Sequence, residues 1–384
     1  MKSRGKLSCL SKEGLKGLIL SGVKMRIVIA GGGTGGHLFP GIAIAEEFLK
    51  RDDRARIIFI GTKKGIESKL LGQLGYELRE IDIEGVSGRG GKALVRGAYQ
   101  IPLSMWQSGR ILKQFRPHIV IGVGGYASGP AVLTAHFMRI PTAIAEQNAI
   151  PGITNRILGN FADKIFVTYA QTQTYFPQTK VILSGNPVRA AFVVERSKEK
   201  EKRDYRQLLV FGGSQGAEAI NNSIIGILPQ LQNMKNKVHV LHQTGSRQAE
   251  EIKKAYEQFG IQAKVTPFIV DMAAAYADAD LIICRAGATS LAEITAAGKA
   301  AILIPYPWAA NDHQLKNAQA LSTEGAAVVI PERELSCKLF NIIDNLLRNE
   351  QKMRQLEENS LRLSKIDAAA TIVDNCIKIM AEKN

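Results

Sequence analysis

Short apolar runs alternate with amphipathic stretches along most of this chain. The first run, Arg26–Ala30, is rich in β-branched residues and stops at three glycines, and after His37 the apolar positions follow helical spacing. This order of strand, loop and helix returns many times. It predicts further strands at 56–60, 118–122, 142–145, 165–168, 181–183, 207–211, 238–243, 263–268 and 281–284. Strands that alternate with helices predict parallel sheets, and therefore an α/β protein.

The second half of the chain restates the pattern of the first. The strand at 207–211 runs into a glycine loop at 212–216, and a helix is predicted at 217–228. Between the halves, SGNPVR at 184–189 interrupts the alternation and is followed by highly charged residues. We therefore expect two doubly wound, Rossmann-like domains, at 25–186 and 187–364, joined by a hinge.

The composition is that of a globular protein with two cores. The chain has 384 residues, 45% of them hydrophobic, and contains no run of about 18 apolar residues that would span a bilayer. Its four cysteines show no paired metal-ligand spacing, which favours the reducing cytosol. Residues 1–24 are basic but lack the long apolar core and clear cleavage site of a signal peptide. We expect them to form a disordered tail, or translation to start at Met25.

The net charge of +15 is concentrated in the first half of the chain, where no acidic residue occurs between Gly85 and Ala145. This stretch includes Lys92, Arg96 and Arg110, and apolar and aromatic residues alternate with its charges. Such a block suits a nucleic-acid site. It suits the headgroup region of an anionic membrane at least as well. A solvated helix face over ordinary core contacts is the third interpretation.

Two glycine-rich loops, GGGTGGH at 31–37 and GVGGYASGP at 122–130, each lie between a predicted strand and a predicted helix. Such loops present backbone N–H groups to an anion, most often a phosphate. The first loop also fits the dinucleotide fingerprint, but the next strand, 56–60, is followed by GTKK and not by the carboxylate that a nicotinamide cofactor requires. His37 directly follows the last glycine, at the mouth of this anion site.

Polar residues at other strand ends complete the candidate site. Glu146, Gln147 and Asn148 follow the strand at 142–145, and ligands of open α/β sheets bind at such carboxyl ends. In the second half, the strand at 281–284 is followed by a predicted loop at 285–290 and a helix at 291–297 that carries Glu293. Loop N–H groups suit a diphosphate and the carboxylate suits the hydroxyls of a ribose, so we predict a nucleotide site. The D-x-D at 278–280 lies before its strand, at the wrong end for the ligand, and no metal site is predicted.

Seven segments, in one order and within residues 25–320, closely resemble the MurG family of bacterial glycosyltransferases. They are GGGTGGH, GVGGYASGP, EQNAIPG, GNPVR, FGGSQGA, RAGATSLAE and NDHQ. The resemblance implies a GT-B fold with an interdomain cleft, and a helix at 365–384 that packs back on the N-terminal domain. It also implies an inverting enzyme with no obligatory metal or cofactor. Such an enzyme moves N-acetylglucosamine from UDP-N-acetylglucosamine to the 4-hydroxyl of the muramoyl sugar of lipid I, the undecaprenyl-pyrophosphoryl-N-acetylmuramoyl-pentapeptide. The products are lipid II, for peptidoglycan synthesis, and UDP.

The resemblance also assigns residues and a location. The implied substrate contacts are Thr34, Gly35, Gly36, Asn148 and Arg189 (donor sugar), Ser214, Ala288, Thr289 and Ser290 with the adjoining Leu291 and Ala292 (diphosphate), Ile269 (uracil), Glu293 (ribose) and Gln314 (sugar). His313 stands where some members have a second glutamine, and residues 1–24 have no counterpart. The family works at the cytoplasmic face of the inner membrane, as a peripheral protein. Its implied partners are therefore an anionic membrane surface and other cell-wall synthesis proteins, but not nucleic acid.

The implied reaction needs one general base that takes the proton of the acceptor hydroxyl. His37 is our first candidate, Glu146 is the second, and a third interpretation has His37 orient the acceptor pyrophosphate. The charge on the departing diphosphate would be met by backbone N–H groups near Ser290. A non-hydrolysing UDP-N-acetylglucosamine epimerase of the same fold stays the alternative function.

Overall fold

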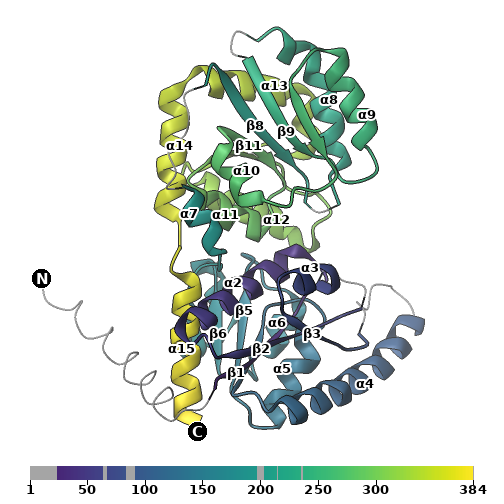
Figure 1. Ribbon diagram of the computed structural model, residues 1–384, viewed down its shortest axis with the longest axis vertical. Coiled ribbons are helices and arrows are strands. Elements are labelled where there is room, and N and C mark those ends of the chain that lie inside the picture. The colour runs from purple at the N-terminus through teal and green to yellow at the C-terminus, as the bar shows by residue number, and fades with distance from the viewer. Residues whose placement is uncertain are drawn as a thin grey trace, which may run out of the picture. The chain divides into compact units, whose positions relative to one another are not determined.

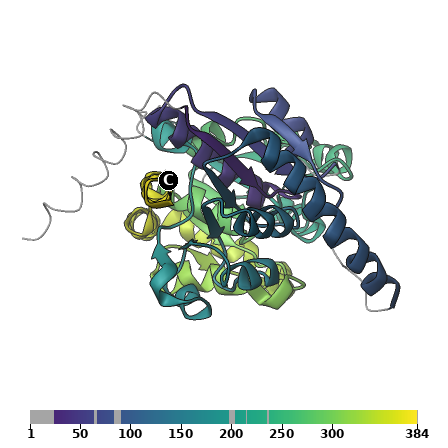
Figure 2. The ribbon, with the colours of Figure 1, turned by 90° about the horizontal axis from the view of Figure 1, so that it is seen from below.

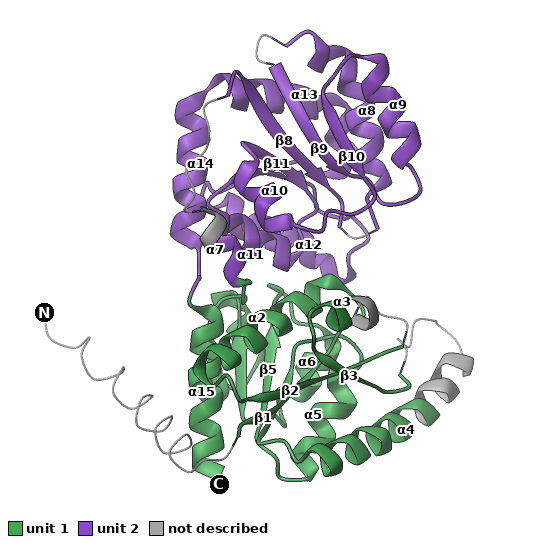
Figure 3. Ribbon diagram, in the orientation of Figure 1, with its two compact units in different colours: residues 1–189, 367–384 green, residues 190–366 purple. Residues whose placement is uncertain are grey.

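The computed structural model describes residues 24–63, 67–83, 91–196, 203–213, 215–234 and 237–383, without the side chains of 67–69, 91–98 and 194–196. The predicted tail up to residue 23 and the predicted site residue Ser214 thus lie outside the described residues. The chain forms two compact units, one of residues 1–189 with 367–384 and one of residues 190–366 (Figure 3). The chain passes from the first unit to the second after Arg189, whereas the sequence analysis places this domain boundary after Asn186.

The first unit is built on a parallel sheet of seven strands in the order β3-β2-β1-β4-β5-β6-β7. Ile29, on the inner strand β1, lies in register with Phe59 on one neighbour and with Ile121 on the other. The strands are β1 (Arg26–Ala30), β2 (Arg56–Gly61), β3 (Glu77–Glu80), β4 (Ile119–Gly122), β5 (Thr142–Glu146), β6 (Lys164–Val167) and β7 (Val181–Leu183). The helices are α2 (Gly35–Arg51), α3 (Glu67–Gln73), α4 (Gly91–Phe115), α5 (Ser128–Phe137), α6 (Ile153–Leu158) and α15 (Ala368–Lys383).

Both faces of this sheet are covered, which is why its inner strands are almost continuously apolar. Ile27 and Ile29 point to one face and share a core with α2 and α15. Val28 and Ala30 point to the other face and share a core with α5. The two helical layers on either side of the strands are visible in two orientations (Figures 1 and 2). Helix α15 contacts α2, and Arg51 of α2 forms an ion pair with Asp374 of α15.

The second unit repeats the plan with a parallel sheet of six strands, ordered β10-β9-β8-β11-β12-β13. The strands are β8 (Tyr205–Phe211), β9 (Lys237–Gln243), β10 (Ala263–Thr266), β11 (Leu281–Cys284), β12 (Ala300–Leu303) and β13 (Val328–Val329). The helices are α7 (Ala190–Arg196), α8 (Glu218–Gln232), α9 (Ala249–Gln258), α10 (Met272–Asp278), α11 (Ala288–Ala297), α12 (His313–Ser322), α13 (Leu335–Arg348) and α14 (Glu350–Leu363). The prediction of an α/β protein with two doubly wound sheets is confirmed. None of the described helices is both long enough and apolar enough to cross a membrane.

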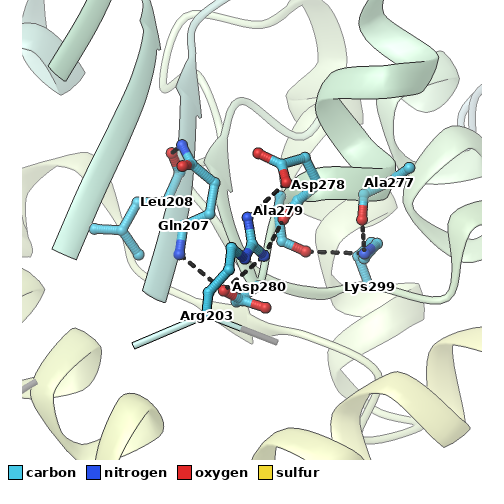
Figure 4. A network of polar contacts seen from close by, with 8 residues as sticks. All are labelled: Arg203, Gln207, Leu208, Ala277, Asp278, Ala279, Asp280 and Lys299. Atoms are coloured by element: carbon cyan, nitrogen blue, oxygen red, sulfur yellow. Dashed lines mark hydrogen bonds and ion pairs between the residues drawn. The ribbon is translucent and has the colours of Figure 1, made fainter. Parts of the chain in front are cut away.

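The amino ends of β8 and β11 are joined by a network of charged side chains (Figure 4). The Arg203 guanidinium forms ion pairs with Asp278 (2.5 Å) and Asp280 (3.4 Å), and Asp280 also accepts from the backbone N–H of Gln207 at 2.8 Å. The buried Lys299 ammonium donates to the carbonyl oxygens of Ala277 and Ala279, at 2.7 and 2.8 Å. The Asp280 carboxylate thus ties the start of β11 to β8, and both carboxylates of the D-x-D hold Arg203, at the end of the sheet opposite the glycine loop.

Candidate functional site

The two glycine loops of the first unit touch each other at the carboxyl ends of β1 and β4. A Cβ atom on Gly31 would lie 2.5 Å from the carbonyl oxygen of Gly124, so this approach requires glycine. The backbone N–H of Val123 donates to the carbonyl of Ala30 at 2.8 Å. The buried Ser128 hydroxyl fixes the junction, because its oxygen accepts from Gly124 N–H at 2.9 Å and lies 2.9 Å from the carbonyl oxygen of Ala30. Ser128 lies within a segment that the sequence analysis singled out, but its role was not predicted.

His37 lies against this junction. A Cβ atom on Gly124 would come within 2.5 Å of the His37 Nδ1, and Gly124 has a φ of +95°, which side chains rarely adopt. The imidazole is half-buried, while neighbouring Thr34 and Gly36 are exposed. The ring therefore sits where the two glycine loops meet.

Helix α2 begins earlier than predicted. It starts at Gly35, so Gly35, Gly36 and His37 form its first turn and not a loop. Thr34 is the N-cap residue in extended conformation, and its side chain makes no capping hydrogen bond. No acidic residue occupies this turn, so the positive end of the helix is not neutralised there by its own side chains.

The segment after β5 is folded around the Glu146 carboxylate. Glu146 is 3% exposed, and it accepts hydrogen bonds from Asn148, Gly152 and Asn155. The buried Gln147 amide donates to the carbonyl of Val123 at 3.1 Å, which ties this segment to the second glycine loop. The predicted site residue Asn148 is thereby held beside the glycine loops. The sequence analysis singled out Gln147 by its place at the end of the strand but not this contact, and Asn155 was not predicted.

Arg189 also reaches the first turn of α2. Its guanidinium carbon lies 4.4 Å from the centroid of the Phe39 ring, and a Cβ atom on Gly35 would touch that same ring at 2.9 Å. The first unit thus brings together the predicted residues of α2, the 146–152 segment and Arg189.

The second unit contains a helix N-terminus at the end of β11. Helix α11 begins at Ala288, and not at Leu291 as predicted, so Thr289 and Ser290 lie in its first turn and Glu293 in its second. Its N-cap is Gly287, which has no side chain to bond with the first N–H groups. The N–H groups of such a first turn point out of the helix end together, and the helix dipole there favours an anion.

Glu293 is almost fully buried, and one partner is the Tyr276 hydroxyl, which donates to its Oε2 at 3.3 Å. Tyr276 is itself inaccessible, and burial followed by the nearby Glu293 charge raises its pKa well above 10. The phenol therefore stays protonated and fixes the carboxylate as a hydrogen-bond acceptor. Tyr276 was not predicted, because nothing in its spacing distinguishes it from a core aromatic residue.

Ile269 and Gln314 each make a contact that limits how they could bind a ligand. The Ile269 N–H donates to Gln243 Oε1 at 2.8 Å, which leaves its carbonyl oxygen for a ligand. The Gln314 Oε1 accepts from Tyr306 N–H at 3.0 Å and so orders the segment before it. His313 Nδ1 lies 2.8 Å from the carbonyl of Ala310, so this nitrogen donates.

Asn311 and Asp312, which precede His313, both adopt φ values of +53°. Left-handed backbone of this kind in residues other than glycine clusters at functional sites. Asp271 caps helix α10 by accepting from Ala274 N–H at 3.0 Å.

A buried histidine in the second unit makes stability depend on pH. Burial lowers the pKa of His242 from 6.5 to about 3, and its ring contacts Tyr256 and Asn221. Below pH 6.5 the imidazole of His242 is protonated in the unfolded chain but stays neutral in the folded chain. The free energy of unfolding should therefore fall by up to about 1.4 kcal/mol per pH unit between pH 6.5 and 3. We expect His242→Gln to show a smaller loss than wild type in urea denaturation at pH 7.5 and 5.5. His136→Gln, on the half-exposed His136, is the control, and equal pH dependence in all three proteins would contradict the prediction.

Comparisons with known proteins match both units. Residues 27–167 match the glycosyltransferase family 28 N-terminal domain, and residues 207–373 match the glycosyltransferase family 28 C-terminal domain. A UDP-N-acetylglucosamine--N-acetylmuramyl-(pentapeptide) pyrophosphoryl-undecaprenol N-acetylglucosamine transferase of Syntrophus aciditrophicus is 52% identical, over 93% of this chain and 99% of that protein.

Solved structures give the same result. MurG of Acinetobacter baumannii is 30% identical with a TM-score of 0.73, over 92% of this chain and 99% of that one. A UDP-GlcNAc 2-epimerase of Neisseria meningitidis is only 12% identical with a TM-score of 0.65, over 93% of this chain and 100% of that one, and so shows the fold alone. Since both domains match in order and a full-length relative shares half of the residues, this chain belongs to glycosyltransferase family 28 and, within it, to the MurG family.

Proposed function

We propose that the protein transfers N-acetylglucosamine from UDP-N-acetylglucosamine to the 4-hydroxyl of the muramoyl sugar of lipid I, which yields lipid II and UDP. The observation that carries the proposal is the 52% identity to a transferase of this printed activity along 99% of its length. In the reaction, the hydroxyl oxygen forms a bond to the anomeric carbon while the bond from that carbon to the diphosphate breaks. The bond electrons leave with UDP, and the hydroxyl proton goes to a base on the protein.

The second unit is our candidate for the donor nucleotide. Backbone N–H groups at Ala288–Ser290, next to Leu291 and Ala292, would meet the diphosphate at the positive end of α11. The buried Glu293 carboxylate would accept from the ribose hydroxyls, and the Ile269 carbonyl oxygen from the uracil N–H. Such prearranged dipoles stabilise the leaving charge without the cost of reorganising water. We also place Ser214 and Gln314 in this site, on the resemblance alone.

The first unit is our candidate for the acceptor. Its paired glycine loops and the uncapped start of α2 suit a pyrophosphate, while Thr34, Asn148 and Arg189 would reach the donor sugar. We propose His37 as the base, because its ring lies where the two loops join and an imidazole can accept a proton near neutral pH.

The function is tested by incubating the purified protein with UDP-N-acetylglucosamine, with and without a lipid I analogue. A transferase releases UDP only when the acceptor is present, and the disaccharide product appears in equal amount. An epimerase would instead convert UDP-N-acetylglucosamine to its C2 epimer without acceptor. Epimer formation, or no UDP release with acceptor, would contradict the proposal.

We further propose that the first unit binds the cytoplasmic face of the bacterial cell membrane as a peripheral protein. On α4, the side chains of Tyr99 and Trp106 are 70% and 58% exposed, and the Arg110 guanidinium lies 5.1 Å from the Trp106 ring. Exposed aromatic groups beside basic ones suit an interface of anionic lipid. Lys92 and Arg96 of the predicted basic block have side chains outside the described residues.

The variant Trp106→Gln/Arg110→Glu should bind anionic vesicles at least about fivefold more weakly than wild type, since one basic residue near such a surface contributes about 1 kcal/mol. Wild-type binding should also weaken as salt is added. The measurement is vesicle co-sedimentation, with Arg354→Glu on exposed α14 as a control of equal charge change. Activity on a soluble acceptor should persist. Equal binding of all three proteins would favour an ordinary solvated helix face.

A further inference from the structure

Glu146 is a buried carboxylate with every acceptor position in use. Its Oε1 accepts from the backbone N–H of Asn148 at 2.9 Å and from the Asn148 side-chain amide at 3.2 Å. Its Oε2 accepts from the backbone N–H of Gly152 at 3.1 Å and from the Asn155 amide at 2.9 Å. Two ionised oxygens offer about four lone-pair sites, so these four bonds exhaust them.

The four donors come from three points of one segment. Asn148 lies two residues after Glu146, Gly152 is the N-cap of α6, and Asn155 lies within α6. The Asn155 amide also donates to the Ala145 carbonyl at 3.1 Å, so α6 is tied to the end of β5 twice. On the other side, the Thr172 hydroxyl donates to the carbonyl of Ala149 at 3.0 Å. The conformation of Asn148 therefore depends on its two hydrogen bonds to the buried Glu146 carboxylate.

We propose that Glu146 is a positioning residue, which holds Asn148 in place for the donor sugar and does not accept the proton of the acceptor hydroxyl. This inference rests on the proposed function. A general base must present a free lone pair within hydrogen-bond reach of the hydroxyl. Glu146 is 3% exposed, and both of its oxygens are already bonded to fixed donors, whose charge-assisted bonds are about twice as strong as neutral ones.

Two sets of variants separate positioning from base catalysis. In Glu146→Gln, an NH2 group replaces one carboxylate oxygen. At the Oε2 position it would face the N–H groups of Gly152 and Asn155, and two donors cannot form a hydrogen bond with each other. Combining it with Asn155→Asp returns an acceptor to that contact, with the carboxylate now on residue 155, but gives up the bond from Asn155 to the Ala145 carbonyl. If Glu146 positions the segment, Glu146→Gln should weaken donor binding and transfer about tenfold or more, and the double variant should recover part of both. If Glu146 is the base, both variants should lose turnover about 100-fold or more with donor binding intact.

Asn155→Ala provides a second test that leaves the carboxylate in place. Positioning predicts weaker binding of UDP-N-acetylglucosamine, whereas a base at Glu146 predicts activity close to wild type. Binding is measured by calorimetry, kcat and KM are measured across pH, and circular dichroism confirms that each variant is folded.

Retention of the acidic limb of the pH profile in Glu146→Gln supports the inference, and its loss overturns it. Unchanged donor affinity in folded Glu146→Gln and Asn155→Ala also overturns it. Absence of transfer by the wild-type protein would instead refute the proposed function, and the calorimetric comparison would still decide whether Glu146 orders the donor contact.

Discussion

His37→Ala should lower the turnover number by about 10²- to 10⁴-fold, which corresponds to about 3–5 kcal/mol of transition-state stabilisation. The imidazole contacts the junction of the two glycine loops and is our proposed base for the acceptor hydroxyl. UDP affinity should be nearly unchanged, because the proposed nucleotide contacts belong to the other unit. Turnover is measured across pH with saturating donor and acceptor, and UDP binding is measured separately.

His136→Ala is the matched control, because it removes an imidazole of the same unit that lies on α5. It should keep wild-type turnover. A drop of less than about tenfold in His37→Ala, with the acidic limb of the pH profile still present, would exclude His37 as the base. Weaker acceptor binding in that variant would instead support a role in orienting the pyrophosphate.

Glu293→Ala should raise the KM for UDP-N-acetylglucosamine by about 10- to 100-fold. A charge-assisted hydrogen bond contributes about 1.5–3 kcal/mol, and water that enters the site replaces part of it. The effect should be confined to nucleotide binding, so the acceptor KM should stay near its wild-type value. Initial rates over a matrix of donor and acceptor concentrations measure both constants.

Tyr276→Phe gives a graded comparison at the same site. It removes only the hydroxyl that donates to Glu293 Oε2, and a net loss of about 0.5–1.5 kcal/mol predicts a smaller rise in donor KM. An unchanged donor KM in folded Glu293→Ala would remove this residue from the nucleotide site. Thermal unfolding of both variants separates lost binding from lost folding.

The order of strands and helices could be predicted because buried parallel strands are short, apolar and bounded by glycine loops. Three strands were not predicted, and each lacks that signal. β3 has the sequence ELRE, and β13 has only two residues. β12 is AAIL, which follows the preceding helix so closely that only Gly298 and Lys299 separate them. Such edge or small-residue strands are specified by their neighbours in the sheet.

The candidate site could be predicted only where the type and spacing of neighbouring residues indicate a function. Glycine loops, His37 and Glu293 carry such a signal in the sequence. Asn155 and Tyr276 do not, because each acts by a contact with a residue that the fold brings near. Helix starts were placed three residues late at both α2 and α11, since residues next to a glycine are as compatible with the first turn of a helix as with a loop. The sequence resemblance named candidate residues, and the structure shows the bonds that order several of them.

Helix α15 lies at the end of the chain but belongs to the core of the first unit. Its side chains Ile372, Val373 and Met380 are inaccessible and pack in the same cluster as Ile27 and Ile29. During synthesis, the first unit therefore leaves the ribosome without α15, the helix that covers part of its sheet. This helix becomes available only after the whole second unit has been synthesised. The second unit, a continuous segment from 190 to 366, has all its own residues when it leaves the ribosome. The unit synthesised first is thus the one whose core is completed last.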